Sequence, residues 1–211
     1  MQHKHKILSE ADWYVSFPLD CDVDELKVWA KEKMKQSKGN KITSGEHDNA
    51  LWWGAQCPPK LKERLEKICP IRPMGNNNYG NDQDWNTYIW ESPEGGRLNK
   101  HSDGEGRGTT FMIILEGEFK ITTYDFKFPD QPLGSYVYKP GEVFALKCGH
   151  RRYHDGETLT NYRLALAVYN DHPTDPFRDH HDGFIPWWGE AGEKTHTVSY
   201  THLTLPTICS V

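Results

Sequence analysis

Two nearby residues carry side chains that could bind one metal ion together. His101 and Asp103 are separated by a single residue, and residues i and i+2 of a β-strand point to the same face. An imidazole and a carboxylate on one face can reach the same ion, as two of the three protein ligands of a facial metal triad. The pair alone is weak support, because a His and an Asp on a solvent-facing strand are common.

A third ligand is expected from one of two histidines farther along the chain. His150 and His154 follow a segment, Lys139 to Leu146, that has the pattern of a glycine turn entering a strand. His154 comes 51 positions after Asp103 and 9 positions before Arg163, whereas His150 precedes Arg163 by 13. Both spacings allow a return strand to carry the imidazole toward the first pair.

The order H-x-D, about fifty residues, His, nine residues and Arg resembles the 2-oxoglutarate/Fe(II)-dependent dioxygenase superfamily. The resemblance covers about residues 85–170, and the glycine lead-in at Gly95 and Gly96 is similar to the prolyl- and aspartyl-hydroxylase-like branch. It implies Fe(II) held by His101, Asp103 and His154, with positions left for 2-oxoglutarate and O₂. The commoner family spacing favours His154 as the distal ligand, and His150 stays open as the alternative.

The same resemblance implies a role for Arg163. Its planar guanidinium would meet the far carboxylate of 2-oxoglutarate inside the barrel; otherwise it is an ordinary arginine on the solvent face of a strand. Family members often place a serine two residues later, where this chain has Ala165. A second donor to the cosubstrate is therefore expected from Thr110, Tyr88 or Tyr162.

The implied activity is hydroxylation of a C–H bond, with release of succinate and CO₂. The branch that the sequence resembles favours an amino-acid or protein side chain, free or in a peptide, as substrate. Asp103 supports hydroxylation, because halogenating relatives lack this carboxylate. The main rival is a cupin-like metal protein or enzyme that does not use 2-oxoglutarate, although cupins usually show H-x-H followed by Glu. The least favoured interpretation is a β-barrel without a functional metal site.

The pattern of elements predicts a mostly β protein with N-terminal helices. Residues 1–84 are expected to be a helical support region, with one helix from Val23 to about Met34 and another after Pro58-Pro59. Residues 85–170 are expected to form the core, a double-stranded β-helix of the jelly-roll or cupin-like kind. Its predicted strands are Trp85–Glu91, Thr109–Leu115, Glu118–Tyr124, Ser135–Lys139, Glu142–Lys147, Arg151–His154 and Tyr162–Tyr169.

The last segments are not expected to carry the site. Residues 171–197 have the composition of an irregular covering segment. Residues 198–211 resemble a translated sequencing adapter, an artefact of reading frames assembled from environmental DNA, so they are expected to carry no fold or function.

The composition argues against some classes of binding partner. A net charge of −5 argues against duplex nucleic acid and anionic membranes as general partners. No apolar run is long enough to span a bilayer, and the five cysteines form no C-x-x-C pair. A cytoplasmic protein is expected, and the sequence does not indicate its oligomeric state.

Overall fold

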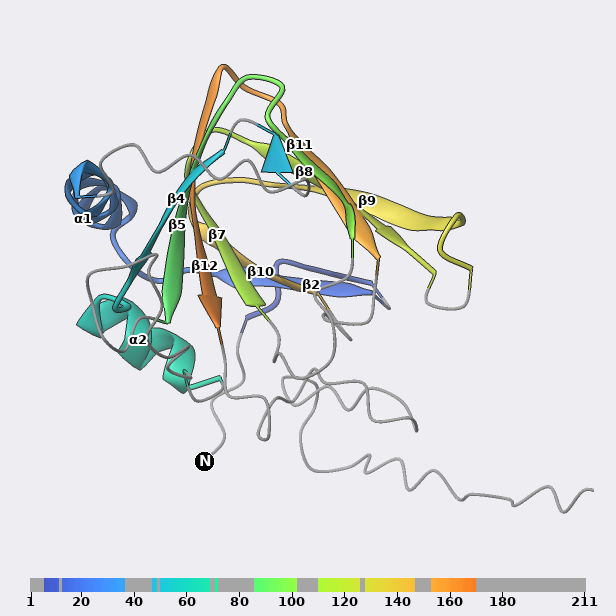
Figure 1. Ribbon diagram of the computed structural model, residues 1–211. Helices are drawn as coiled ribbons and strands as arrows, with labels where there is room; N and C mark the ends of the chain where they lie inside the picture. Colours follow the sequence, from blue (N-terminus) through green and yellow to red (C-terminus); the bar gives the residue numbers. More distant parts are fainter. Residues whose placement is uncertain are drawn as a thin grey trace, which may run out of the picture.

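Short runs of β-branched and aromatic residues, separated by Gly and Pro, form two antiparallel sheets that face each other (Figure 1). The computed structural model describes residues 6–11, 13–36, 47–48, 50–68, 71, 86–101, 110–125, 128–146 and 153–169. In chain order the elements are β1 (Ser9–Ala11), β2 (Tyr14–Pro18), α1 (Val23–Lys35), β3 (His47–Asp48), β4 (Leu51–Ala55), α2 (Pro59–Glu66), β5 (Thr87–Pro93), β6 (Arg97–His101), β7 (Thr110–Glu116), β8 (Phe119–Tyr124), β9 (Pro132–Tyr138), β10 (Glu142–Leu146), β11 (His154–Thr158) and β12 (Tyr162–Tyr169).

The larger sheet has the order β1-β2-β10-β7-β12-β5-β4, and the smaller sheet has the order β3-β6-β11-β8-β9. The connections β5–β6, β7–β8 and β11–β12 each cross from one sheet to the other. In Figure 1 the sheets converge where these connections lie, at the top, and separate toward the opposite end. Backbone hydrogen bonds tie the turns together, from Glu94 N to Asn161 O (2.9 Å) and from Leu159 N to Glu118 O (3.0 Å).

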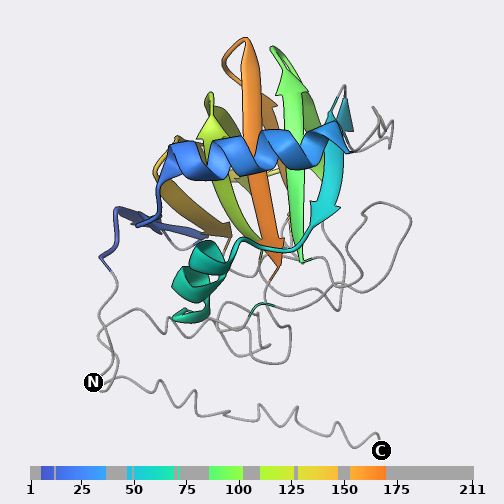
Figure 2. The same ribbon diagram turned by 90° about the vertical axis from the view of Figure 1, so that its left-hand side faces the viewer.

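The larger sheet separates two apolar cores. Residues such as Phe111, Ile113 and Leu166 pack on the outer face with the helices. The inner face contributes Ile114, Phe144 and Ala165 to a second core, shared with residues of the smaller sheet. Figure 2 shows α1 crossing the outer face of the larger sheet, with α2 beside it. The helices therefore support one wall of the space between the sheets.

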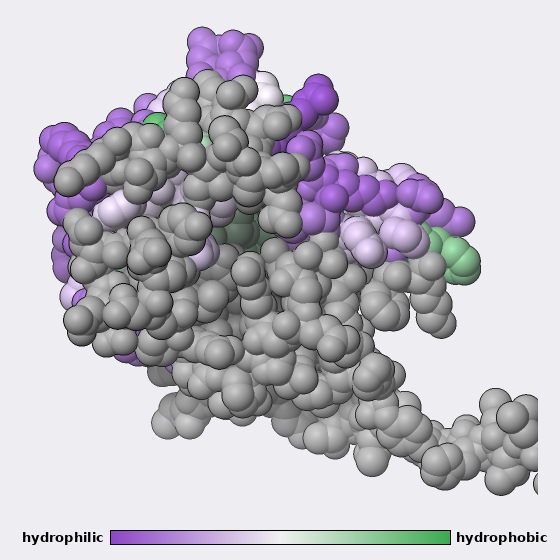
Figure 3. Space-filling model, viewed as in Figure 1, coloured by the Kyte–Doolittle hydropathy of each residue, from purple (hydrophilic) through white to green (hydrophobic). Residues whose placement is uncertain are grey.

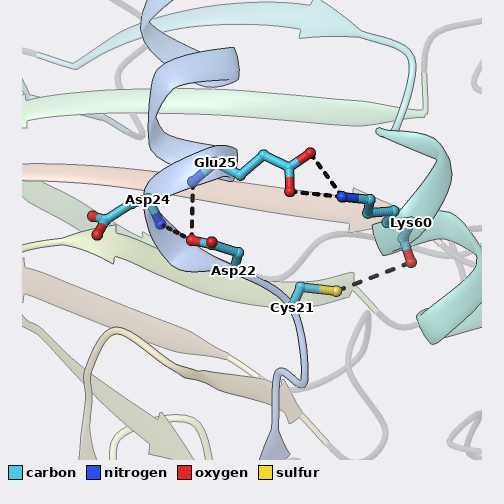
Figure 4. Close-up of polar contacts among 5 residues, drawn as sticks. All are labelled: Cys21, Asp22, Asp24, Glu25 and Lys60. Carbon is cyan, nitrogen blue, oxygen red and sulfur yellow. Dashed lines mark hydrogen bonds and ion pairs between the residues drawn. The ribbon is translucent and has the colours of Figure 1, made fainter.

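An N-terminal cap fixes the start of α1 (Figure 4). Asp22 Oδ1 accepts hydrogen bonds from the backbone N–H groups of Asp24 (2.9 Å) and Glu25 (3.1 Å). The Glu25 carboxylate also pairs with Lys60 Nζ of α2 at 2.8 Å. That pair is solvent-exposed, so it contributes little to stability.

Replacing Asp22 by alanine is expected to lower the free energy of unfolding by about 1 kcal/mol, because the substitution removes the cap acceptor. Urea denaturation measures the change. Asp22→Asn is the matched control, since an asparagine side chain can cap the same N–H groups. Equal losses in both variants would show that the cap does not stabilise α1.

Both predicted helices are found, but the description of residues 1–84 as a helical support region is only partly right. This part of the chain also supplies β1, β2 and β4 to the larger sheet and β3 to the smaller one. These strands are short, and their apolar residues do not alternate cleanly. They are strands because β10, β5 and β6 offer them unpaired edges. Residues 69–70 and 72–85 lie outside the described residues.

Six of the seven predicted strands share most of their residues with observed strands, and Tyr162–Tyr169 agrees at both ends. The seventh, Arg151–His154, shares only His154 with an observed strand. The bounds predicted for this strand are wrong, because the strand extends after His154 and does not end there. The observed β11 begins at His154 and continues to Thr158. The segments 171–197 and 198–211 lie outside the described residues.

The surface of the described part is mostly hydrophilic in Figure 3, with a hydrophobic patch at the far right, where β8 and β9 protrude in Figure 1. Exposed side chains near this end include Phe128 and Leu133. Among the described residues, none of the helices has both the length and the apolar character needed to cross a bilayer.

Candidate functional site

The imidazoles of His101 and His154 lie side by side where the two sheets separate. His101 ends β6, His154 begins β11, and the two residues are directly opposite each other in the pairing of these strands. Their ring centroids are 4.5 Å apart. Directly opposite residues share a face of a sheet, and His154 is buried while His101 is half-buried. The structure thus brings two of the three predicted metal ligands together.

A bulge in β6 turns His101 toward the inside. His154 pairs with His101 and Gly156 pairs with Leu98, so three steps along β6 match two steps along β11. Without the extra residue, His101 and Leu98 would face opposite sides of the sheet. With it, the histidine shares the inner face with buried Leu98.

The backbone orients the ring of His101. Its Nδ1 lies 2.7 Å from the carbonyl oxygen of Asn99. A carbonyl oxygen can only accept, so Nδ1 carries the proton in this contact and Nε2 keeps its lone pair. A ring held in this way by a carbonyl is typical of metal-binding histidines. The chemistry of the pair therefore fits a transition metal such as iron.

The other predicted ligands cannot be placed. Asp103 and His150 lie outside the described residues, and the described part of the chain holds no group of three or more His, Cys, Asp or Glu arranged to bind a metal. Asp103 follows the last residue of β6 by two positions.

A second polar group lies deeper between the sheets, around Arg163. Thr158, Phe119 and Tyr138 are directly opposite one another on β11, β8 and β9. The guanidinium carbon of Arg163, reaching across from β12, stands 4.0 Å from the centre of the Phe119 ring. Thr158 and Tyr138 therefore flank Phe119, the residue on whose ring the guanidinium rests.

Several polar atoms of this group are buried and lack a partner among the described residues. Arg163 donates from Nη2 to Ser92 Oγ at 2.9 Å. Its Nε, the hydroxyl of Tyr138 and the Oγ1 of Thr158 make no hydrogen bond with any residue that the structure describes. Burial lowers the pKa of Arg163 from its ordinary value and raises the pKa of Tyr138 above its ordinary value. The phenol is thus a donor, and a buried cation beside unpaired donors favours an anionic ligand.

Gly156 brings this polar group close to the histidines. A Cβ on Gly156 would lie 2.3 Å from Cε1 and Cζ of Phe119, so the phenyl ring occupies the place of the missing side chain. The guanidinium stands over that ring, and Gly156 is two residues from His154 along β11. Two residues of a strand span about 6.6 Å. A small molecule with acidic groups at both ends could therefore reach both sites.

Gly156→Ala is expected to lower the free energy of unfolding by about 1–3 kcal/mol through overpacking. It is also expected to weaken the binding of 2-oxoglutarate, the cosubstrate that the sequence resemblance implies. The new methyl would displace the Phe119 ring, and the ring supports Arg163. Thermal denaturation and a ligand titration measure the two effects. Gly134→Ala is the comparison, because the three atoms nearest to its Cβ would all belong to the Trp13 side chain, the first of them at 3.2 Å. Unchanged binding in Gly156→Ala would mean that the ring does not position the guanidinium.

The structure places the three predicted second donors in different surroundings. The assignment of Tyr162 is wrong, because its hydroxyl donates to Glu91 Oε1 at 2.6 Å and its ring packs with the outer core. Tyr88 lies in a ring cluster with Trp52, at a centroid distance of 4.4 Å. Thr110 is half-buried at the start of β7, opposite Tyr169. The roles of Tyr88 and Thr110 stay predictions.

Sequence reasoning did not identify Tyr138, Thr158 or Ser92. Their positions around Arg163 depend on pairing between strands that are far apart in the chain. Hydroxyl residues in β-strands are common, so no local signal distinguishes these three from the others.

No protein-family model and no curated protein sequence matches this chain. Among solved structures, OsALKBH1 has a TM-score of 0.53 at 12% identity, over 79% of this chain and 100% of that one. The viral collagen prolyl hydroxylase of Paramecium Bursaria Chlorella virus-1, solved as a 2OG complex, gives a TM-score of 0.47 at 13% identity over 77% and 97% of the two chains. A Pseudomonas putida prolyl-4-hydroxylase gives 0.46 at 12% over 79% and 93%. The likeness to OsALKBH1 shows a shared fold.

Proposed function

We propose that the protein is an Fe(II)- and 2-oxoglutarate-dependent oxygenase. The observation that carries the proposal is the shared interior space of two adjacent imidazoles and a buried guanidinium. His101 and His154 lie at the end where the sheets separate, with Arg163 deeper inside. The two groups match the opposite ends of one small dicarboxylate.

His101, His154 and Asp103 would hold the iron, in a facial triad that leaves three positions for ligands. Bound iron supplies the O₂ chemistry, and the protein supplies orientation and a dry site. Arg163 would bind the far carboxylate of 2-oxoglutarate through its planar fork. The buried hydroxyls of Tyr138 and Thr158 would be further donors to this carboxylate.

The proposed reaction inserts one oxygen atom of O₂ into a C–H bond of the substrate. The other atom enters succinate, as 2-oxoglutarate loses CO₂. The similarity of the sequence to prolyl- and aspartyl-hydroxylase-like enzymes supports an amino-acid or protein side chain as substrate. The half-buried rings of Tyr88 and Trp90 would then line the wall of the larger sheet beside it.

The rival, a cupin-like metal protein without 2-oxoglutarate, would share the histidines. It gives no reason for a buried guanidinium that has only Ser92 as hydrogen-bond partner among the described residues. Leaving such donors unpaired costs about 1–3 kcal/mol for each group. A dicarboxylate that pairs them removes this penalty.

The test is an anaerobic titration of the Fe(II)-loaded protein with 2-oxoglutarate. A visible metal-to-ligand charge-transfer band is expected, which saturates with added ligand. Pyruvate is the matched probe, because it keeps the chelating 2-oxo acid but lacks the far carboxylate, and weaker binding is expected. Bound metal with no band at any 2-oxoglutarate concentration would favour the cupin-like rival.

A further inference from the structure

Thr123 on β8 is a buried residue that the proposed metal and carboxylate sites leave unused. Its side chain is fully buried (0% exposed). Its Oγ1 makes no hydrogen bond with any residue that the structure describes. Thr122, the preceding residue, faces the other way, and its Oγ1 lies 2.9 Å from Ser135 Oγ on the exposed face.

The pairing of four strands places Thr123 next to the histidines. His101 is opposite His154, His154 is opposite Thr123, and Thr123 is opposite Gly134. Directly opposite residues share a face, so the threonine extends the row of the two imidazoles by one strand, about 4.8 Å. Thr123 is thus a neighbour of the metal site.

Other side chains lie on both sides of Thr123 along this row. His154 lies on one side, and on the other the indole of Trp13 covers Gly134, where a Cβ would lie 3.2 Å from Trp13 Cζ2. Within the described structure, the remaining direction for a partner of the hydroxyl is the space between the sheets, in front of the histidines. A small ligand bound in that space can supply it.

Four buried polar side chains along this space have an atom without a partner in the described structure, and they form two groups. Arg163, Tyr138 and Thr158 make up the deep group, and Thr123 stands alone beside His154. A ligand with a carboxylate only at the deep end would leave Thr123 unpaired. A ligand with a carboxylate at each end satisfies both groups, and 2-oxoglutarate has that form.

We infer that Thr123 is a cosubstrate-binding residue whose hydroxyl donates to the carboxylate at the metal-chelating end of the 2-oxo acid. The inference rests on the proposed function. Thr123 orients the reacting end of the molecule, while Arg163 holds the opposite end.

The test compares Thr123→Val, which replaces the hydroxyl by a methyl of similar size, with Thr122→Val on the outer face. In the Fe(II)-loaded protein, Thr123→Val is expected to raise the dissociation constant of 2-oxoglutarate on the order of tenfold, the usual effect of losing a hydrogen bond to a charged group. The binding of pyruvate to Thr123→Val is weakened equally, because pyruvate carries the same chelating end. In contrast, Thr158→Val is expected to weaken the binding of 2-oxoglutarate but not the binding of pyruvate. Thr122→Val changes neither constant.

Thermal stability in the absence of metal and ligand distinguishes the proposed role from a purely structural one, because the two roles change Tm in opposite directions. Without metal and ligand, Thr123→Val is expected to raise Tm by about 2–4 °C, since an unpaired buried hydroxyl is removed. Lower Tm with an unchanged dissociation constant would overturn the inference and assign Thr123 to packing. Thr123→Ser and Thr123→Ala form a second pair, and equal affinities in these two variants would overturn it as well.

The two proposals fail in different ways. If the wild type gives the charge-transfer band and Thr123→Val binds 2-oxoglutarate equally well, the inference about Thr123 is wrong and the oxygenase stands. If the Fe(II)-loaded wild type binds no 2-oxoglutarate, the oxygenase proposal and the inference fall together.

Discussion

Replacing His154 by alanine is expected to lower the affinity for Fe(II) on the order of 100-fold or more. The loss of residues that only orient a ligand costs 10–100-fold in metal affinity, so the loss of a ligand itself should cost at least as much. The effect should be similar in His101→Ala, because the two rings, 4.5 Å apart, form one pair. The charge-transfer band with 2-oxoglutarate should vanish in both variants.

Anaerobic metal titration of the purified variants measures this loss, and thermal denaturation shows whether the fold survives. Lys100→Ala is the matched control. Lys100 precedes His101 on β6, but its Nζ lies 4.0 Å from the centre of the Tyr124 ring and pairs with Asp130 at 3.2 Å. This exposed pair contributes little to stability, so the control should bind Fe(II) like the wild type.

Asp103 provides a further check on the ligand set. Succinate production that survives the combined Asp103→Ala and His154→Ala substitutions would rule out the proposed triad. Loss of Fe(II) binding in His101→Ala, together with normal Fe(II) binding in His154→Ala, would instead point to His150 as the distal ligand.

The strands around the site could be predicted where the sequence signal is local. Tyr162–Tyr169 alternates residues of the outer core, such as Leu164 and Leu166, with Arg163 and Ala165 on the inner face. That period of two is readable without any knowledge of pairing. The helix from Val23 has a capping aspartate and a lysine-rich end, which are also local signals.

Long-range pairing explains what could not be predicted. β11 was expected to end at His154, but it begins there, because its partners β6 and β8 continue along the segment to Thr158. The turn of His101 toward the interior depends on a bulge that appears only when β6 is matched to β11. A bulge changes which residues share a face, and spacing within one strand does not reveal it.

The glycine at position 156 shows the same limit. In the sequence, Gly156 lies in a polar stretch two residues after His154, and a glycine in such a stretch is generally typical of a turn. In the structure it lies within β11 and leaves room for the ring of Phe119, a residue 37 positions earlier in the chain. The requirement for glycine arises from the packing of a distant side chain, so the pattern of β11 alone could not show it.

Arg163→Met is expected to weaken 2-oxoglutarate binding on the order of 100-fold and, at the same time, to stabilise the ligand-free protein. The affinity falls because the variant loses a bidentate, charge-assisted contact to the far carboxylate. Anaerobic titration of the Fe(II)-loaded variant measures the first effect. Pyruvate should bind the variant and the wild type equally, since it makes no contact at this end.

The gain in stability follows from the burial of the guanidinium. Arg163 is only 5% exposed, and its Nε has no partner within the described structure. Replacing a buried charge by an apolar side chain of similar length often stabilises a protein by about 1–4 kcal/mol. Methionine is unbranched and can follow the path of the arginine stem over the Phe119 ring. Tm of the ligand-free variant should therefore rise.

Added 2-oxoglutarate should reduce or reverse the difference in stability between the wild type and the variant. At a ligand concentration of about 100 times the dissociation constant, binding stabilises the wild type by about 2.7 kcal/mol, and the variant gains almost nothing. Arg97→Met, at an exposed position of β6, is the matched control and should keep the ligand-induced shift in Tm. Arg163→Lys should restore only part of the affinity, because an ammonium lacks the planar fork. If Arg163→Met destabilises the ligand-free protein and leaves the affinity unchanged, the guanidinium is a structural group and the far carboxylate binds elsewhere.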